Sequence, residues 1–178
     1  MDLIFLRHTT PHVAPGTCYG RTDLDLADSF ADEAQAVASV IPKASHIVSS
    51  PLKRCRKLAE HLSRTFSLPM EVEPRLTEMD FGSWEGLPWS DIPRAQLDAW
   101  AKDFLHARPH DGETVAELHA RVMDLISELK NGRERTLLVT HAGIIKAAFA
   151  TGDEVTDYQT TVEFGGHITL SLDKGEVR

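Results

Sequence analysis

Two histidines stand directly after apolar runs that lie far apart in the chain. His8, with Arg7 before it, follows residues 3–6, and His141 follows residues 137–140. If these runs are strands of one open α/β sheet, both imidazoles lie beyond the carboxyl ends of the strands, where such sheets bind ligands. A neutral imidazole is a good nucleophile at neutral pH, so we expect His8 to attack a substrate.

Groups that could bind a phosphate accompany these histidines. Arg7 ends the first run, and Arg54 lies in the first turn of a helix expected over residues 52–66. A guanidinium group can bind two phosphate oxygens at once. Ala142 and Gly143 open a later helix, where free backbone N–H groups attract an anion. Together these groups predict an oxyanion site and therefore a phosphoryl-transfer enzyme.

The barrier to phosphate-ester hydrolysis requires a general acid as well as cations. Enzymes accelerate this reaction by up to about 10²¹-fold, or roughly 28 kcal/mol, whereas one well-placed arginine contributes on the order of 4 to 7 kcal/mol. A carboxyl group that protonates the leaving alkoxide is therefore expected on the turn-rich segment 76–86. Glu78 is the first candidate, and Glu85 and Asp80 are the alternatives.

The hydrophobic pattern predicts the elements that position these residues. Apolar runs and alternating segments predict strands, and apolar residues three and four positions apart predict helices. The expected strands are residues 2–7, 45–49, 71–73 and 135–140, with a closing pair, 160–164 and 167–172, across Gly165 and Gly166. The expected helices are residues 28–41, 52–66, 91–105, 114–129 and 142–150. Because strands and helices alternate, we expect an α/β layered sandwich with a mostly parallel central sheet flanked by helices.

The bulk composition narrows the class of protein. At 178 residues and 42% hydrophobic content, the chain suits a single domain over residues 1–178. The net charge of −8 and the lack of a basic stripe argue against nucleic acid as a partner. No apolar run approaches the roughly 18 residues that span a bilayer, so no membrane partner is expected. Cys18 and Cys55 are too few for a disulfide framework, which favours a cytoplasmic protein.

Several short motifs occur in an order that is typical of one enzyme family. They are Leu6-Arg7-His8-Thr9, Cys18-Tyr19-Gly20-Arg21-Thr22-Asp23, Ser49-Ser50-Pro51-Leu52-Lys53-Arg54, Leu76-Thr77-Glu78, Phe81-Gly82-Ser83-Trp84-Glu85-Gly86, Gly112-Glu113-Thr114 and Thr140-His141-Ala142-Gly143. With these motifs the chain resembles the histidine phosphatase superfamily, in its phosphoglycerate-mutase-like branch. The resemblance implies a phosphohistidine intermediate on His8 and an acid at Glu78. It also implies phosphate contacts from Arg7, Arg54 and His141, and neither a metal nor another cofactor.

Residues 7–23 are similar to those of one subgroup, the α-ribazole phosphatases, which act in cobalamin biosynthesis. This similarity implies hydrolysis of α-ribazole 5'-phosphate, with Tyr19 and Gly20 among the substrate-binding residues. A nucleoside-like leaving group needs a flat apolar surface, which stacked aromatic rings could supply. The candidates are Tyr19, Phe81, Trp84 and Trp89. Phe81 and Trp84 could equally be core residues.

The loop after His8 departs from the pattern of the family. The family usually continues with Gly-Glu-Thr or Gly-Glu-Ser, whereas Thr9, Thr10 and Pro11 follow here. Ala14 also stands where the family usually has Asn. The departure bears on the phosphate contacts that this loop can make.

Other functions stay open on the sequence alone. A broad-specificity sugar-phosphate phosphatase or a phosphoglycerate-mutase-like enzyme would use the same residues, although so short a chain favours hydrolysis. A non-catalytic phospholigand-binding domain would keep the oxyanion site without turnover. A zinc protein is disfavoured because Pro109 separates His106 from His110. A Cys55 nucleophile lacks the usual phosphate loop. The expected partner is a small phosphorylated metabolite, and a homodimer stays open.

Overall fold

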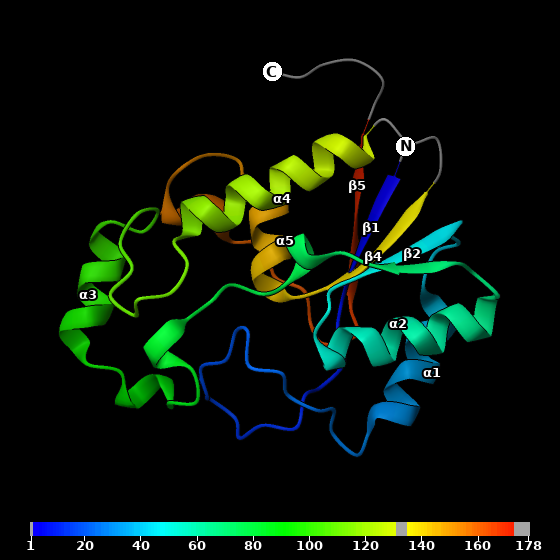
Figure 1. The fold of residues 1–178 in the computed structure, drawn as a ribbon, viewed down its shortest axis with the longest axis horizontal. Coiled ribbons are helices and arrows are strands. Elements are labelled where there is room, and N and C mark those ends of the chain that lie inside the picture. The colour runs from blue at the N-terminus through cyan, green and yellow to red at the C-terminus, as the bar shows by residue number, and fades with distance from the viewer. Residues whose placement is uncertain (1, 131–134, 173–178) are drawn as a thin grey trace.

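The computed structural model describes residues 2–130 and 135–172, which form a five-stranded sheet with helices on both faces (Figure 1). The strands are β1 (Asp2–Arg7), β2 (His46–Ser49), β3 (Met70–Val72), β4 (Thr136–Thr140) and β5 (His167–Ser171). Their order in the sheet is β3-β2-β4-β1-β5. The α-helices are α1 (Phe30–Val40), α2 (Lys53–Phe66), α3 (Arg94–Lys102), α4 (Val115–Leu129) and α5 (Ala142–Ala148). The single domain expected over residues 1–178 extends beyond the described residues and stays a prediction.

The sheet brings two strand ends together. β1 lies between β4, to which it is parallel, and β5, to which it is antiparallel. In the register of β1 and β4, Arg7 lies opposite Thr140. The next residues, His8 and His141, are therefore neighbours at one edge of the sheet. The backbone N–H of His8 also donates to the carbonyl of Thr140 at 3.0 Å, which fixes this edge.

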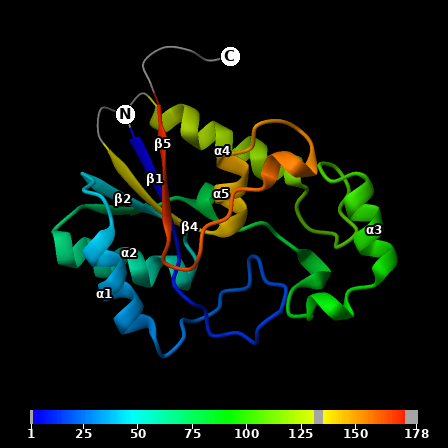
Figure 2. The same ribbon diagram turned by 180° about the vertical axis from the view of Figure 1, so that it is seen from behind.

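Alternate residues of the central strands face two different helical layers. Phe5 and Leu138 belong to the core that α4 and α5 cover, whereas Leu6 and Val139 belong to the core that α1 and α2 cover. Figures 1 and 2 show these two pairs of helices on opposite sides of the sheet. Because both faces are covered, β1 and β4 read in the sequence as continuous apolar runs.

A third, smaller core lies beside the sheet and supports the loops that approach the strand ends. Its members are Cys18, Trp84 and Ile92, with Phe81, Leu97 and Trp100 packed against them. Trp84 is 1% exposed, and its Nε1 donates to Oε1 of Gln96 on α3 at 2.6 Å. Figure 1 shows α3 at the left of the molecule, on the opposite side from β2. The small core therefore joins α3 to the segment that carries the candidate acids.

The expected α/β architecture is confirmed, and the closing strand pair is wrong. Residues 160–164 form no strand, and β5 pairs with β1 alone among the described strands. The residues before β5 instead pack against the end of β1, where the carbonyl of Val162 accepts a hydrogen bond from Arg7. The alternation of apolar and polar residues over 160–164 therefore reflects packing against β1 and not strand pairing. The helix expected over residues 91–105 is also shorter, because Pro93 is the N-cap of α3.

Candidate active site

The two histidine rings lie side by side at the carboxyl ends of β1 and β4. Their centroids are 5.2 Å apart, and the planes are inclined by 63°. Both rings are buried, with His8 2% exposed and His141 fully covered. The shared register of the two strands, which no local pattern contains, produces this juxtaposition.

The hydrogen bonds of His8 leave one ring nitrogen unprotonated. Nδ1 lies 2.7 Å from the carbonyl oxygen of Thr9, which can only accept, so Nδ1 carries the proton. Nε2 then accepts from Nε of Arg54 at 3.3 Å. Burial, and after it the charges of Arg54 and Arg7, together lower the pKa of His8 to about 3, although the hydrogen bond to Thr9 opposes them. His8 is therefore a neutral imidazole at physiological pH, and its Nε2 carries the lone pair.

Arg54 is a fully buried cation held by the loop that follows β1. Its Nη1 donates to the carbonyl of Thr22 and its Nη2 to that of Gly20, both at 2.7 Å. Its Cζ lies 5.3 Å from the centre of the Tyr19 ring. A Cβ at Gly20 would lie 1.9 Å from the carbonyl oxygen of Met79, so only glycine fits there. Gly20 thus orients Arg54 through its backbone and does not line the cavity described below.

Arg7 is positioned by a segment that the sequence analysis did not assign to the site. Its Nη1 donates to the carbonyl of Val162 at 2.8 Å, and its Cζ lies 3.9 Å from the centre of the Phe164 ring. The Phe164 ring also lies 5.5 Å from that of His8. The Nε–H of Arg7 is buried and has no hydrogen-bond partner among the described residues. A partly buried guanidinium with an unused, buried donor is suited to an anion.

His141 is held by α2 and the turn before it. Its Nε2 lies 2.8 Å from Oγ of Ser50 and 3.4 Å from Sγ of Cys55. Burial lowers the pKa of His141 well below its ordinary value, and the proximity of His8 and Arg54 adds to the effect. Burial also raises the pKa of the Cys55 thiol. A protonated, fully buried thiol is a poor nucleophile, which weakens the cysteine alternative.

The three candidate acids lie in different environments. Glu78 lines the cavity, where its Oε1 accepts from the N–H of Met79 at 2.9 Å and its Oε2 from that of Gly143 at 3.1 Å. A Cβ at Gly143 would lie 2.2 Å from Oε1 of Glu78, so the glycine makes room for the carboxylate. Among the three, Glu78 alone lines the cavity.

Glu85 and Asp80 hold loops together instead. Glu85 accepts from the N–H groups of Arg21, Thr22 and Phe81. Burial alone would raise the pKa of Glu85, but these hydrogen bonds lower it below the ordinary value. Asp80 accepts from the N–H of Gly82 at 2.8 Å and lies 3.7 Å from Arg21. Both carboxylates thus connect their own segment to the loop that follows β1.

The residues that depart from the family pattern are also engaged locally. Thr10 donates through its N–H and its hydroxyl to Oε2 of Glu33 on α1, at 2.9 and 3.1 Å. Thr9 is fully buried, and neither threonine lines the cavity. The loop after His8 is therefore anchored to α1 through Thr10, whereas the buried hydroxyl of Thr9 has no hydrogen-bond partner among the described residues.

A cavity of about 410 Å³ opens from His8, Arg7 and Glu78. Its aromatic walls are formed by Tyr19, Phe81, Trp89, Trp100, Phe104 and Tyr158. Ala142 and Gly143 lie at its floor with Glu78, and Lys146 and Gln159 add polar groups. Trp84 belongs to the small core and not to the wall, so the stacking role considered for it is wrong.

Two further features concern the described residues as a whole. Within residues 2–130 and 135–172, no three His, Cys, Asp or Glu side chains gather as metal ligands, and His106 and His110 are no exception. In the same part of the chain, no helix has the length and apolar character needed to cross a bilayer.

Comparison with known proteins relates this geometry to one family. The sequence profile of the histidine phosphatase superfamily (branch 1) matches residues 3–161. A glucosyl-3-phosphoglycerate phosphatase from Mycolicibacterium vanbaalenii is 34% identical over 164 residues, covering 83% of this chain and 72% of its own. The adenosylcobalamin/α-ribazole phosphatase of Escherichia coli is 29% identical over 162 residues, covering 84% and 78%. A mycobacterial glucosyl-3-phosphoglycerate phosphatase structure superposes with a TM-score of 0.82 at 27% identity, covering 94% of this chain and 88% of that one.

The chain belongs to the histidine phosphatase superfamily, branch 1, and is a phosphoric monoester hydrolase of that family. It shares the α/β fold of its structural relatives. The names of these two relatives refer to different substrates, glucosyl-3-phosphoglycerate in one and adenosylcobalamin or α-ribazole phosphates in the other. The choice between such substrates therefore depends on the residues that line the walls of the cavity.

Proposed function

We propose that the chain hydrolyses a small phosphorylated metabolite through a phosphohistidine intermediate on His8. The observation that carries this proposal is the unprotonated Nε2 of His8, which the pKa of about 3 keeps without a proton and whose lone pair faces Arg54. A buried lone pair next to a guanidinium group suits attack on a phosphorus atom whose oxygens that cation binds.

The reaction has two steps that balance on these residues. In the first, His8 Nε2 attacks phosphorus, the P–O bond to the leaving group breaks, and Glu78 donates a proton to the departing alkoxide. In the second, water attacks phosphorus, Glu78 takes up a proton from it, and the P–N bond breaks to release orthophosphate. Arg7, Arg54 and His141 stabilise the charge on the transferring group.

We further propose α-ribazole 5'-phosphate as the substrate, in cobalamin biosynthesis. The aromatic rings of Tyr19, Phe81 and Trp89 line the cavity beside the candidate acid, which suits a flat heterocycle attached to a ribose. The name of the Escherichia coli relative supports this choice. The heterocycle would stack on the faces of these aromatic rings, and the phosphate would lie at His8.

One observation favours a second candidate, a glucosyl-3-phosphoglycerate. Lys146 lines the cavity, and its ammonium group has no hydrogen bond or ion pair among the described residues. Such a cation suits the carboxylate of a phosphoglycerate. The name of the mycobacterial relative agrees with this alternative.

A trapping experiment tests the chemistry. Rapid acid-free quenching of turnover, followed by mass spectrometry, should find one phosphoryl group on the peptide that contains His8. His8→Ala should lose the adduct and lower kcat/KM by at least about 10⁴-fold, as removal of a nucleophile does. An active His8→Ala enzyme, or an adduct on another residue, would reject the mechanism.

A matched pair of substrates tests the leaving group. α-Ribazole 5'-phosphate and ribose 5-phosphate differ only in the heterocycle, whose stacking should raise kcat/KM by about 10- to 100-fold. Trp89→Ala should remove much of this advantage without affecting ribose 5-phosphate. If glucosyl-3-phosphoglycerate is the better substrate and Lys146→Met abolishes the preference, the second candidate replaces the first.

The thiols support a proposal about the compartment. Cys18 and Cys55 are both buried and free. A protein that works with unpaired cysteines is typical of a reducing environment. We therefore assign its activity to the cytoplasm, which fractionation with a tagged chain would test.

A further inference from the structure

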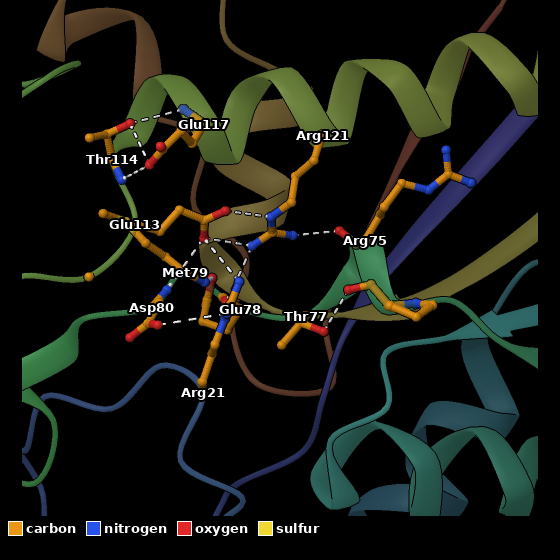
Figure 3. Close-up of polar contacts among 12 residues, drawn as sticks. Arg21, Arg75, Thr77, Glu78, Met79, Asp80, Glu113, Thr114, Glu117 and Arg121 are labelled. Carbon is orange, nitrogen blue, oxygen red and sulfur yellow. Dashed lines mark hydrogen bonds and ion pairs between the residues drawn. The ribbon is translucent and has the colours of Figure 1, made fainter.

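Arg121, on α4, binds the backbone of the segment that carries Glu78. Its Nη1 donates to the carbonyl of Arg75 at 2.5 Å, and its Nη2 donates to the carbonyl of Glu78 at 3.3 Å. Figure 3 shows the side chain of Arg121 extending from α4 toward this backbone and toward Glu113. None of these contacts follows from a role in binding substrate, because Arg121 does not line the cavity.

Glu113 completes the arrangement from the turn before α4. It binds Arg121 in a two-pronged ion pair, with Nε to Oε1 at 2.7 Å and Nη2 to Oε2 at 2.9 Å. Both side chains are largely buried, at 17% and 10% exposure. The backbone N–H of Glu113 donates to the carbonyl of Asp80 at 2.9 Å, and the N–H of Asp80 donates to Oε2 of Glu113 at 3.4 Å. The pair therefore binds the chain at both Glu78 and Asp80.

We propose that the Arg121–Glu113 ion pair positions the candidate general acid, and this inference rests on the proposed function of Glu78. The carboxylate of Glu78 takes its orientation from two backbone donors, Met79 N–H on its own segment and Gly143 N–H on α5. Both bonds persist only while the segment keeps its place relative to α5. Arg121 supplies that restraint, because it ties the segment to α4, which packs on α5 in the same core.

The close packing around Gly112 limits how far the Glu78 segment can move relative to the start of α4. A Cβ at Gly112 would lie 2.1 Å from the carbonyl oxygen of Asp80, so the two loops approach as closely as backbone allows. α4 then begins with a capping box in which Thr114 and Glu117 bind each other's backbone N–H groups. A displacement of the Glu78 segment is therefore resisted by α4, which carries Arg121 and whose capped start follows Glu113 directly.

Arg75 provides a matched comparison. Its side chain forms ion pairs with Glu73, Asp124 and Glu128, the last two of which are more than half exposed. Only its carbonyl contacts Arg121, and a substitution of the side chain leaves that carbonyl in place. Asp124 and Glu128 lie on α4, so Arg75→Met also removes contacts between this segment and α4, but only exposed ion pairs, which contribute little. The buried bonds of Arg121 to the segment stay in place.

The test compares two leaving groups, because a displaced acid slows only the reactions that need a proton. Nitrophenolate leaves without protonation, whereas the alkoxide of ribose 5-phosphate requires it. Arg121→Met should lower kcat/KM for ribose 5-phosphate by about 10- to 100-fold, as small misplacement of a reacting group does, and that for nitrophenyl phosphate by less than about 3-fold. Arg121→Lys should recover part of the loss, and Arg75→Met should behave as wild type.

A double-mutant cycle with Glu78→Gln separates positioning from general damage. If Arg121 acts through Glu78, Arg121→Met should reduce ribose 5-phosphate turnover by less than about 3-fold further in the Glu78→Gln background. Fully additive losses, or equal losses on both substrates, would overturn the inference. If Arg121→Met fails to fold, as thermal unfolding would show, Glu113→Gln and Arg121→Lys carry the same comparison.

The outcomes also distinguish this inference from the proposed function. If Glu78→Gln slows both leaving groups equally, Glu78 is not the acid and the proposed mechanism fails. If Glu78→Gln is selective for the alkyl ester and the Arg121 and Glu113 variants are not, the mechanism stands and the positioning role is rejected.

Discussion

The imidazole of His8 stays neutral because burial and two neighbouring cations outweigh the one influence that favours a second ring proton. Burial removes the water that would solvate the cation, and Arg54 and Arg7 repel positive charge. Only the bond to the Thr9 carbonyl favours the charged form, and it also fixes the tautomer. The surroundings of His8 therefore keep it in the unprotonated form that the proposed nucleophile requires.

This environment predicts how His8 titrates. Its pKa falls from an ordinary value of 6.5 to about 3, so ¹⁵N-resolved NMR should show an unprotonated Nε2 at every pH from about 5 to 8. Between these two pKa values the unfolded chain binds more protons than the folded one. The free energy of unfolding should thus fall as the pH drops through this window, by up to about 1.4 kcal/mol per pH unit from this residue. A ring that titrates near 6.5 would contradict the geometry.

At the scale of elements, the start of α5 and the segment around Glu78 form one unit. The N–H of Gly143 donates to Glu78, and the absence of a side chain at Gly143 leaves the space that the carboxylate occupies. The sequence suggested that this helix start would bind an anion. In the structure, the donor of Gly143 is instead engaged by a carboxylate of the protein.

Gly143→Ala tests this use of the helix start. The new Cβ would lie 2.2 Å from Oε1 of Glu78, so the carboxylate must move. We expect kcat/KM for alkyl phosphates to fall by about 10²-fold and the free energy of unfolding to fall by about 1 to 3 kcal/mol. Calorimetry and kinetics would measure the two effects. Adding Glu78→Asp, whose side chain is one methylene shorter, should restore stability but not activity, and an unchanged Gly143→Ala enzyme would refute the packing argument.

At the scale of the whole molecule, a cationic pocket lies inside an acidic protein. The net charge is −8, yet Arg7 and Arg54 converge on His8 at the strand ends. The acidic exterior repels polyanions at long range. The pocket, in contrast, can hold the small anion that the reaction releases.

Product binding should therefore stabilise the fold. Orthophosphate at 100 times its dissociation constant should raise the free energy of unfolding by about 2.7 kcal/mol. For a chain of this size, that corresponds to an increase in Tm of roughly 5 to 11 °C. Arg7→Met should abolish most of the increase, whereas Arg94→Met, a surface variant on α3, should keep it. An equal increase in both variants would place the anion elsewhere.

The sequence by itself determined which residues end the buried strands. Apolar runs before His8 and His141 are local patterns, and a sheet covered on both faces can be inferred from them. The capping box at Thr114 and the start of α2 near Arg54 are equally local. Such features are visible because the residues that make them lie within one turn or one strand of each other.

Only the tertiary structure decided how these residues are oriented. Arg7 is held by Val162, 155 positions away, and Glu78 by Gly143, 65 positions away. The choice of Glu78 over Glu85, the place of Phe164 against Arg7, and the burial of Trp84 all depend on such distant contacts. No periodicity records them, because the contacting residues meet only when the sheet has formed and the loops have packed across its edge.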